Sequence, residues 1–212
     1  MKIFTRKSGG FSLIEVAIAI VVIGLVASFA LKGKELINTV KLRSVVEQVN
    51  AIKLATQTFV DKYGALPGDF SKAREIINDS LVNGAGNGHI SSTEDAKRFW
   101  QHLAASELLN MELVDGYPVS KVGGYYTVSS NIANHPGTWI VLCKKTKDNQ
   151  SFEGVLSPAD AYFIDKNNDT GNPTTGEIQV IKGASASGDC FNGNQYNLKN
   201  KSKDCVVIFK IW

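Results

Sequence analysis

Glu15 is the first residue whose type and position could do chemistry, because it is the only charged side chain in the apolar run from Phe11 to Leu31. A carboxylate at the centre of a bilayer costs about 2.5–3.5 kcal/mol on insertion scales, and less near the interface. As the fifth residue of the run, Glu15 would lie about one helical turn deep. A charge in such a segment indicates a functional site with a partner of opposite sign. The N-terminal amine of a neighbouring copy would supply that partner.

A second pattern of oxygen-bearing side chains lies toward the C-terminus. These side chains occupy three alternate positions, as ligands do in calcium-binding loops: Asp165, Asn167 and Asp169. The spacing departs from an EF-hand, because Thr170 replaces the usual glycine and Gly176 replaces the final glutamate. Two interpretations stay open. One is a Ca²⁺ site completed by Asp160 or Glu177, and the other is a turn whose Asp and Asn side chains bond their own backbone.

The three cysteines suggest one disulfide. Cys190 and Cys205 would close a loop of about 15 residues and add about 3 kcal/mol in the loop-entropy model. Such a bond suits an oxidising compartment. Cys143 lies in the apolar run 139–143, where a buried free thiol on a strand is expected. Three pairings are possible, so Cys190–Cys205 is a preference.

The other polar residues do not suggest an enzyme. The histidines are scattered, without a second ligand at metal spacing: His89, His102 and His135. The sequence has no nucleophile elbow, phosphate-binding glycine loop or HExxH motif. Two lysine clusters, at 144–147 and 199–203, are typical of solvated loops, with DNA capture as the alternative. Beyond residue 10 the chain carries 20 basic and 20 acidic side chains, so no nucleic-acid partner is expected.

The element that must hold Glu15 is a helix that follows a short basic leader. Residues 1–10 contain three basic side chains and no acidic one, and they end in two glycines. The 21 residues from Phe11 to Leu31 would span about 31 Å as a helix, which matches the hydrocarbon thickness of a bilayer. We expect the leader to stay in the cytoplasm and the rest of the chain to lie outside.

Two simpler interpretations of this segment are a cleaved signal peptide and a plain signal anchor. A signal peptide usually has an apolar region of about 7–15 residues and a small-residue cleavage site, which Ser28–Ala30 imitates. The length of the run and the acid inside it favour a more specialised segment.

The helix is predicted to continue past the membrane to about Tyr63, near 80 Å in total, and to end at Gly64 and Pro67. An amphipathic stripe supports this continuation: Leu42, Val45, Val49, Ile52, Thr56, Phe59 and Tyr63. A helix this long cannot bury its whole length in one small domain. Its first half must therefore meet lipid or other helices, while its second half packs on the domain.

The rest of the chain is predicted to form an α+β head. A short helical stretch around Ala73–Ile77 precedes a helix that a capping box at Ser91 and Glu94 opens and that runs to about Leu109. The core face of that helix comprises Ala96, Phe99, Trp100, Leu103, Ala104 and Leu108. Strands are expected at 125–128, 138–143, 178–181 and 206–212. The predicted architecture is a long N-terminal α-helical spine packed on an antiparallel β-sheet.

The junction between leader and helix carries a family resemblance. It reads Gly10-Phe11-Ser12-Leu13-Ile14-Glu15 and resembles the processing motif of type IV prepilins and type II secretion pseudopilins. The resemblance implies that a membrane-embedded prepilin peptidase cuts after Gly10 and N-methylates Phe11. It also implies that Glu15 pairs with the amine of a neighbouring subunit during assembly, and that the fold is type IV pilin-like. The segments Leu66–Asp69 and Trp100–Leu103 are also similar to a pilin-like subgroup.

These observations together predict a structural subunit of a type IV pilus or a type II secretion pseudopilus. Its divisions would be a cleaved leader at 1–10, a filament-core helix at 11–31, a continuation at 32–63 and a head at 64–212. The expected partners are prepilin peptidase, other subunits, an inner-membrane assembly platform and membrane lipid. The expected location is the bacterial inner membrane, with a single pass, and then the filament. A Ca²⁺ cofactor would fit, because some pseudopilins bind calcium near their C-terminal strands. The alternatives are a minor tip or priming pilin and a monomeric membrane-anchored periplasmic protein.

Overall fold

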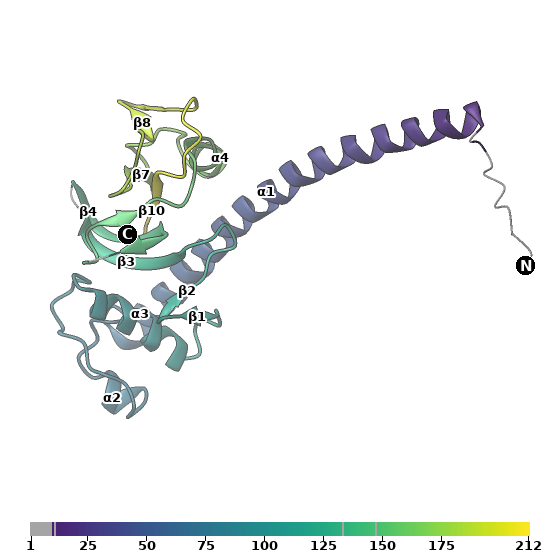
Figure 1. Ribbon diagram of the computed structural model, residues 1–212. Coiled ribbons are helices and arrows are strands. Elements are labelled where there is room, and N and C mark those ends of the chain that lie inside the picture. Colours follow the sequence, from purple (N-terminus) through teal and green to yellow (C-terminus); the bar gives the residue numbers. More distant parts are fainter. Residues whose placement is uncertain (1–9, 11, 133, 147) are drawn as a thin grey trace, which may run out of the picture. The chain divides into compact units, whose positions relative to one another are not determined.

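The computed structural model describes residue 10 and residues 12–132, 134–146 and 148–212. One helix, α1, runs over 51 residues from Leu13 to Tyr63 (Figure 1). The chain divides within this helix into two compact units, Met1–Val40 and Lys41–Trp212. The predicted long helix is confirmed from Leu13 onward. Its C-terminal stop is confirmed too, because Gly64 has φ +70° and its N–H donates to the Val60 carbonyl at 2.8 Å.

In the second unit, the predicted stripe of α1 faces the core. Its members are buried, apart from Tyr63, which is half-buried: Leu42, Val45, Val49, Ile52, Thr56, Phe59 and Tyr63. Thr56 is the only polar member, and its hydroxyl donates to the Ile52 carbonyl at 2.8 Å. A buried hydroxyl that is bonded in this way carries little desolvation cost. The helical periodicity therefore predicted the buried face of α1 correctly.

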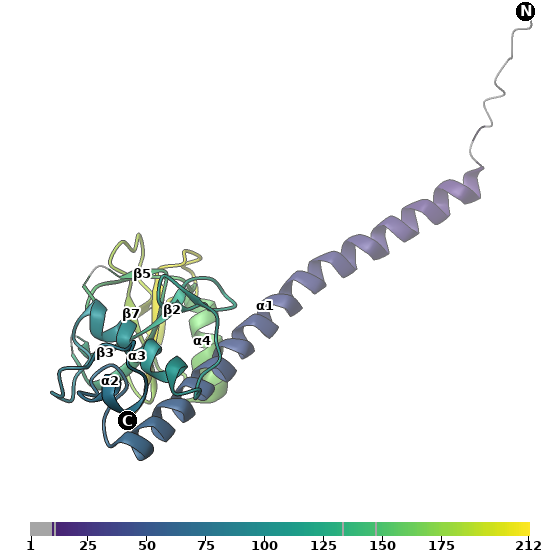
Figure 2. The ribbon, with the colours of Figure 1, turned by 90° about the horizontal axis from the view of Figure 1, so that it is seen from below.

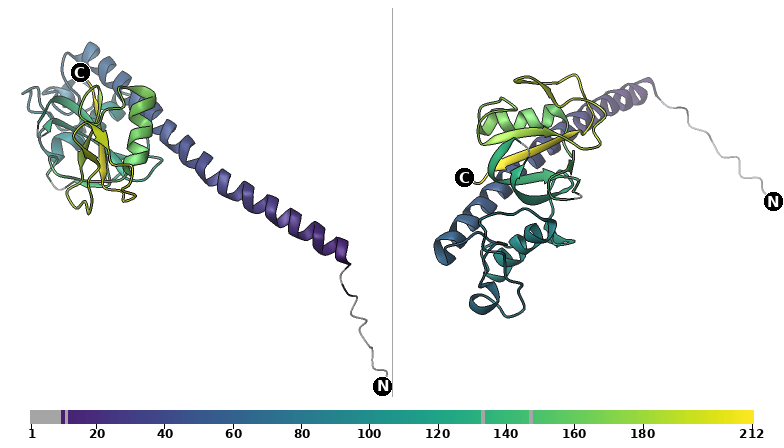
Figure 3. Two further views of the ribbon diagram at one scale, coloured as in Figure 1. Left: turned by 90° about the horizontal axis from the view of Figure 1, so that it is seen from above. Right: turned by 90° about the vertical axis from the view of Figure 1, so that its left-hand side faces the viewer.

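The core of the head is a four-stranded antiparallel sheet with the order β3-β4-β10-β7. Its strands are β3 (Tyr125–Ile132), β4 (His135–Cys143), β7 (Ile178–Lys182) and β10 (Cys205–Lys210). In Figure 3, β10 is the yellow arrow inside this sheet. All four predicted strands are confirmed, with somewhat different ends, and so is the α+β class with a long N-terminal helix and an antiparallel sheet.

Alternate residues of the strands point to opposite faces of the sheet. On β4, Ile140 and Leu142 join the main core with the stripe of α1, whereas Trp139, Val141 and Cys143 join a second, smaller cluster with Phe152. In the part of the chain that the structure describes, three two-stranded hairpins complete the strands: β1–β2 (Leu113–Val114 and Tyr117–Pro118), β5–β6 (Lys145–Thr146 and Phe152–Glu153) and β8–β9 (Phe191–Asn192 and Gln195–Tyr196).

Shorter helices lie at the two edges of the sheet. Helix α3 (Thr93–Ala105) contacts β3, and α4 (Pro158–Asn168) contacts β7, as Figure 1 and Figure 2 show. A single turn, α2 (Ala73–Ile76), follows α1. Helix α4 is not predicted from the sequence, and its last residues fall in the segment for which a calcium loop or a turn is expected.

The capping box at the start of α3 lies one residue later than the sequence predicts. Ser92 accepts a hydrogen bond from the Asp95 N–H at 3.1 Å, and the Asp95 carboxylate accepts one from the Ser92 N–H at 3.0 Å. The capping box is therefore Ser92–Asp95, one residue after the predicted Ser91–Glu94, since both pairs have the required spacing. The helix also ends at Ala105, before Leu109, and Ala104 is exposed while His102 is buried.

Candidate processing and assembly site

The N-terminal site begins at Gly10, which is exposed and has no atom within 4 Å of the position that a Cβ would take. Phe11 lies outside the described residues, as do the basic side chains of the leader. Just before α1, the Ser12 carbonyl accepts the N–H groups of Glu15 at 3.0 Å and Val16 at 3.1 Å. Glu15 is thus in the first turn, where the partial positive charge of the helix end favours an acid.

The apolar segment that follows is exposed on every side. All described side chains from Leu13 to Phe29 are exposed, and Leu13 is 92% accessible. Helix α1 is long and apolar enough to cross a membrane. A helix that is apolar all round needs lipid or other protein around it, because such a surface is unfavourable in water. Glu15 is the only charge within that surface.

The three predicted calcium residues lie in the last turn of α4 and directly after it. Asp165 and Asn167 lie on α4 rather than in a loop. The buried Asp165 carboxylate accepts the Tyr196 hydroxyl at 2.7 Å and the Gly171 N–H at 2.9 Å. Burial raises the pKa of Asp165, although the hydrogen bond from Tyr196 lowers it.

The other two members of that pattern have separate partners. Asn167 donates to the Phe163 carbonyl at 2.6 Å, and Asp169 accepts the Ile178 N–H at 2.8 Å. Within the described part of the chain, no group of three His, Cys, Asp or Glu side chains is placed to hold a metal ion. The Asp165 and Asp169 oxygens and the Asn167 amide group thus bond groups at the end of α4, in the chain after it and at the start of β7. A Ca²⁺ site at these residues stays a prediction.

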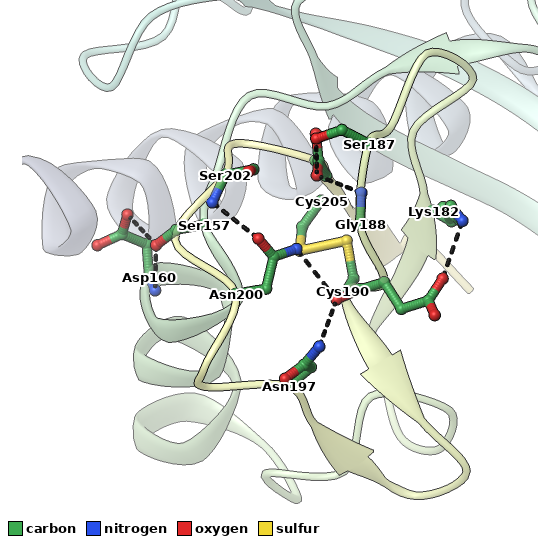
Figure 4. Close-up of a disulfide and its surroundings, with 12 residues drawn as sticks. Ser157, Asp160, Lys182, Ser187, Gly188, Cys190, Asn197, Asn200, Ser202 and Cys205 are labelled. Atoms are coloured by element: carbon green, nitrogen blue, oxygen red, sulfur yellow. Dashed lines mark hydrogen bonds and ion pairs between the residues drawn. A yellow bond between two sulfur atoms is a disulfide. The ribbon is translucent and has the colours of Figure 1, made fainter.

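The predicted disulfide between Cys190 and Cys205 is present, with the two Cα atoms 5.4 Å apart (Figure 4). Amide side chains support the loop it closes: Asn197 and Asn200 donate to the Asp189 carbonyl at 3.3 Å and 3.1 Å.

Cys143 is free and buried, as expected, and burial raises the pKa of its thiol to about 12. A neutral thiol in this position acts as a small apolar group.

The segments Leu66–Asp69 and Trp100–Leu103, which were singled out from the sequence, lie together in one cluster of hydrogen bonds. The sequence did not predict this cluster. The ring of buried His102 accepts the Gly68 N–H at Nδ1, at 3.0 Å. Because an N–H can only donate, the proton of the neutral ring is on Nε2, which donates to the Val82 carbonyl at 3.0 Å. The adjacent Asp69 accepts the N–H groups of Asn87 at 2.9 Å and Gly88 at 2.7 Å. His102 and Asp69 thereby hold the chain that follows α1, and local sequence patterns give no signal for such distant pairs.

This cluster predicts a pH dependence of stability. Burial lowers the pKa of His102 more than its bond to Val82 raises it. The unfolded chain therefore takes up the proton before the folded chain does. The contribution of neutral His102 to the free energy of unfolding should be fully present above the ordinary histidine pKa of about 6.5. The free energy of unfolding should then fall as the pH drops below that value. Denaturant titrations between neutral and mildly acidic pH measure this.

His102→Gln should flatten that pH profile, because glutamine cannot be protonated, and should lower stability at neutral pH. Replacing the exposed His89 with glutamine is the matched control and should leave the profile unchanged. An unaltered profile in His102→Gln would contradict the assignment.

The N-terminal segment matches a motif found in known proteins. Residues 5–31 match the prokaryotic N-terminal methylation motif. No curated protein matches the chain. Among solved structures, the chain is similar to the major type IV pilin PilA1 from Clostridium difficile, with 16% identity and a TM-score of 0.42, over 82% of this chain and 96% of that one. In its N-terminal segment, the chain therefore carries the prepilin-type methylation motif that the residues from Gly10 to Glu15 predicted.

Proposed function

We propose that the chain is a structural subunit of a type IV pilus or a type II secretion pseudopilus. One observation carries the proposal: the methylation motif at residues 5–31 is continuous with a helix whose described apolar side chains, as far as Phe29, are all exposed. Residues 42–59 of the same helix supply the stripe that packs on the head. The apolar segment is thus left free for lipid and then for neighbouring subunits.

The proposed sequence of events begins in the inner membrane, where a single pass holds the leader in the cytoplasm and the head in the periplasm. Prepilin peptidase cuts between Gly10 and Phe11 and methylates the new amine. The assembly platform then moves the apolar helix from lipid into the filament core. Glu15 pairs there with the amine of a neighbouring Phe11, since a buried charge without a partner is costly. The divisions that follow are leader 1–10, core helix 11–31, continuation 32–63 and head 64–212.

N-terminal sequencing of the mature protein tests the proposal. The expected first residue is N-methylated Phe11. Gly10→Val should block cleavage, because the peptidase would meet a branched side chain at its cutting site. Gly24→Val is the control and should be cut normally, because Gly24 also has open space around it but lies inside α1. A mature N-terminus at Leu31 or at Met1 would instead support a signal peptide or an uncleaved anchor.

The number of copies in purified filaments refines the proposal. Many copies per filament indicate a major subunit, whereas a few copies indicate a minor tip or priming subunit. Absence from filaments, with the protein retained in the membrane, would favour a monomeric anchored protein.

A further inference from the structure

Three asparagines in this chain are followed directly by glycine: Asn83, Asn87 and Asn192. In such a pair the backbone nitrogen of the glycine can attack the side-chain amide carbon of the asparagine, because glycine has no side chain to hinder the approach. The attack needs a glycine N–H that is not held in a hydrogen bond and an amide that is free to turn. The structure distinguishes the three pairs on both points.

The pair Asn83–Gly84 is held on both sides. The Gly84 N–H donates to the Phe70 carbonyl at 2.8 Å. The Asn83 amide accepts the Arg74 N–H at 2.8 Å and donates to the Glu75 carboxylate at 3.1 Å. Neither the attacking nitrogen nor the amide is free.

The pair Asn87–Gly88 is held by a buried carboxylate. The Gly88 N–H donates to Asp69 Oδ2 at 2.7 Å, and the Asn87 N–H donates to Asp69 Oδ1 at 2.9 Å. The Asn87 side-chain oxygen also accepts the His89 N–H at 2.9 Å. A hydrogen bond to a charged group is stronger than one between neutral groups, and it must be broken before Gly88 can react.

The pair Asn192–Gly193 is not held in this way. It lies at the turn of the β8–β9 hairpin, where Asn192 pairs with Gln195 and is exposed. Gly193 has φ +55°, and nothing lies within 4 Å of the position that its Cβ would take. Within the described residues, neither the Asn192 side chain nor the Gly193 N–H takes part in a hydrogen bond.

Other asparagines of the disulfide loop differ from Asn192 in this respect. The side chains of Asn197 and Asn200 donate to the Asp189 carbonyl (Figure 4). The Asn194 side-chain oxygen accepts the Thr174 hydroxyl at 3.2 Å. Free rotation of an amide beside an unhindered glycine is therefore a local property of the hairpin turn, and not of the loop as a whole.

We propose that Asn192 is a site of spontaneous deamidation in the folded protein, in addition to the function proposed above. The Gly193 nitrogen gives its proton to solvent and forms a bond to Asn192 Cγ. The side-chain nitrogen takes up a proton from solvent, its bond to Cγ breaks, and it leaves as ammonia. Water then opens the five-membered succinimide at either carbonyl, which leaves an aspartyl or an isoaspartyl residue at position 192. The net change is the exchange of an amide for a carboxylate, with water consumed and ammonia released.

Deamidation would affect the contact between the β8–β9 hairpin and α4. It adds a negative charge to the turn, and the isoaspartyl form adds a methylene to the main chain between the paired positions Asn192 and Gln195. Tyr196 follows directly in β9, and its hydroxyl binds Asp165 of α4 at 2.7 Å. Deamidation is therefore expected to loosen the β8–β9 hairpin from α4 as the protein ages.

Peptide mapping by mass spectrometry tests the proposal on the purified full-length chain in detergent. The protein is incubated at mildly alkaline pH in heavy-oxygen water, so that each conversion incorporates label. The peptide that contains Asn192 should convert roughly tenfold or more faster than those with Asn83 and Asn87, given the bonds that protect Gly84 and Gly88. Conversion at comparable rates in the folded chain, or faster at Asn83 or Asn87, would overturn the assignment.

Two controls test whether the difference in deamidation rates comes from the fold or from the local sequence. In concentrated denaturant the three peptides should convert at similar rates, because each is an Asn–Gly pair. If Asn192 stayed much faster there, the fold would not be the cause. Asn192→Gln should abolish conversion at position 192 without changing the other two sites, because glutamine would have to close a larger ring.

Discussion

Gly68→Ala is expected to prevent the head from folding stably. A Cβ at position 68 would lie 2.6 Å from the Asp95 carbonyl oxygen and 2.7 Å from the Phe99 nitrogen. Both are backbone atoms of α3, so no side chain can rotate away. Residue 68 also has φ +80°, and displacing it would break its hydrogen bond to His102. We expect the free energy of unfolding to fall by about 4 kcal/mol or more, a loss typical of severe core disruption. Tryptophan fluorescence during urea titration measures it, because Trp100 and Trp139 are both buried in the folded head.

Gly64→Ala is the matched control for this prediction. Gly64 also has a positive φ, of +70°, but nothing lies within 4 Å of the position that its Cβ would take. Alanine there should cost only the strain of a left-handed backbone, about 1 kcal/mol. If both variants lost the same stability, backbone strain rather than contact with α3 would be the cause.

Glu15→Val is expected to be processed normally but not to enter filaments. This prediction depends on the proposed function, in which Glu15 pairs with a neighbouring amine inside a dry filament core. Removing one partner of a buried ion pair costs about 3–5 kcal/mol, so the filament yield should fall roughly a hundredfold or more. Valine fits the apolar segment, so membrane insertion should not suffer. Quantification of sheared filaments, together with N-terminal sequencing of the membrane fraction, separates assembly from processing.

Glu35→Val controls for the loss of an acid from the same helix. Glu35 is exposed on α1 but lies beyond the apolar run that ends at Leu31. Filaments should form from this variant. Normal assembly of Glu15→Val would contradict the pairing role of Glu15.

Some features of this protein could be predicted because they are local in sequence. The apolar run after Gly10, the stripe from Leu42 to Phe59 and the alternation along β4 each follow from helical or strand periodicity over a few residues. The motif at residues 5–31 is likewise contiguous. The sequence by itself therefore determined the long helix, the strands of the sheet and the candidate processing site.

Two cases show where local patterns are ambiguous. Ser91–Glu94 and Ser92–Asp95 both have capping-box spacing, and only the folded chain selects the second pair. Alternating oxygens from Asp165 to Asp169 resemble a calcium loop, but the first two lie on α4. An aspartate contributes the same oxygens to a metal, a turn or a distant hydroxyl, so its partner decides its role.

Tertiary structure alone decided the partners that lie far apart in the chain. Gly68 meets His102 across 34 residues, and Tyr196 meets Asp165 across 31. The Asp69 carboxylate accepts the Gly88 N–H, whereas the Gly193 N–H has no hydrogen-bond partner among the residues that the structure describes. Periodicity records which face of an element is apolar, but a hydrogen bond between distant residues depends on how the elements pack. The N-terminal segment could therefore be interpreted from its residues alone. The hydrogen bonds that hold the head together, and the unprotected Asn–Gly turn of the β8–β9 hairpin, could be identified only from the fold.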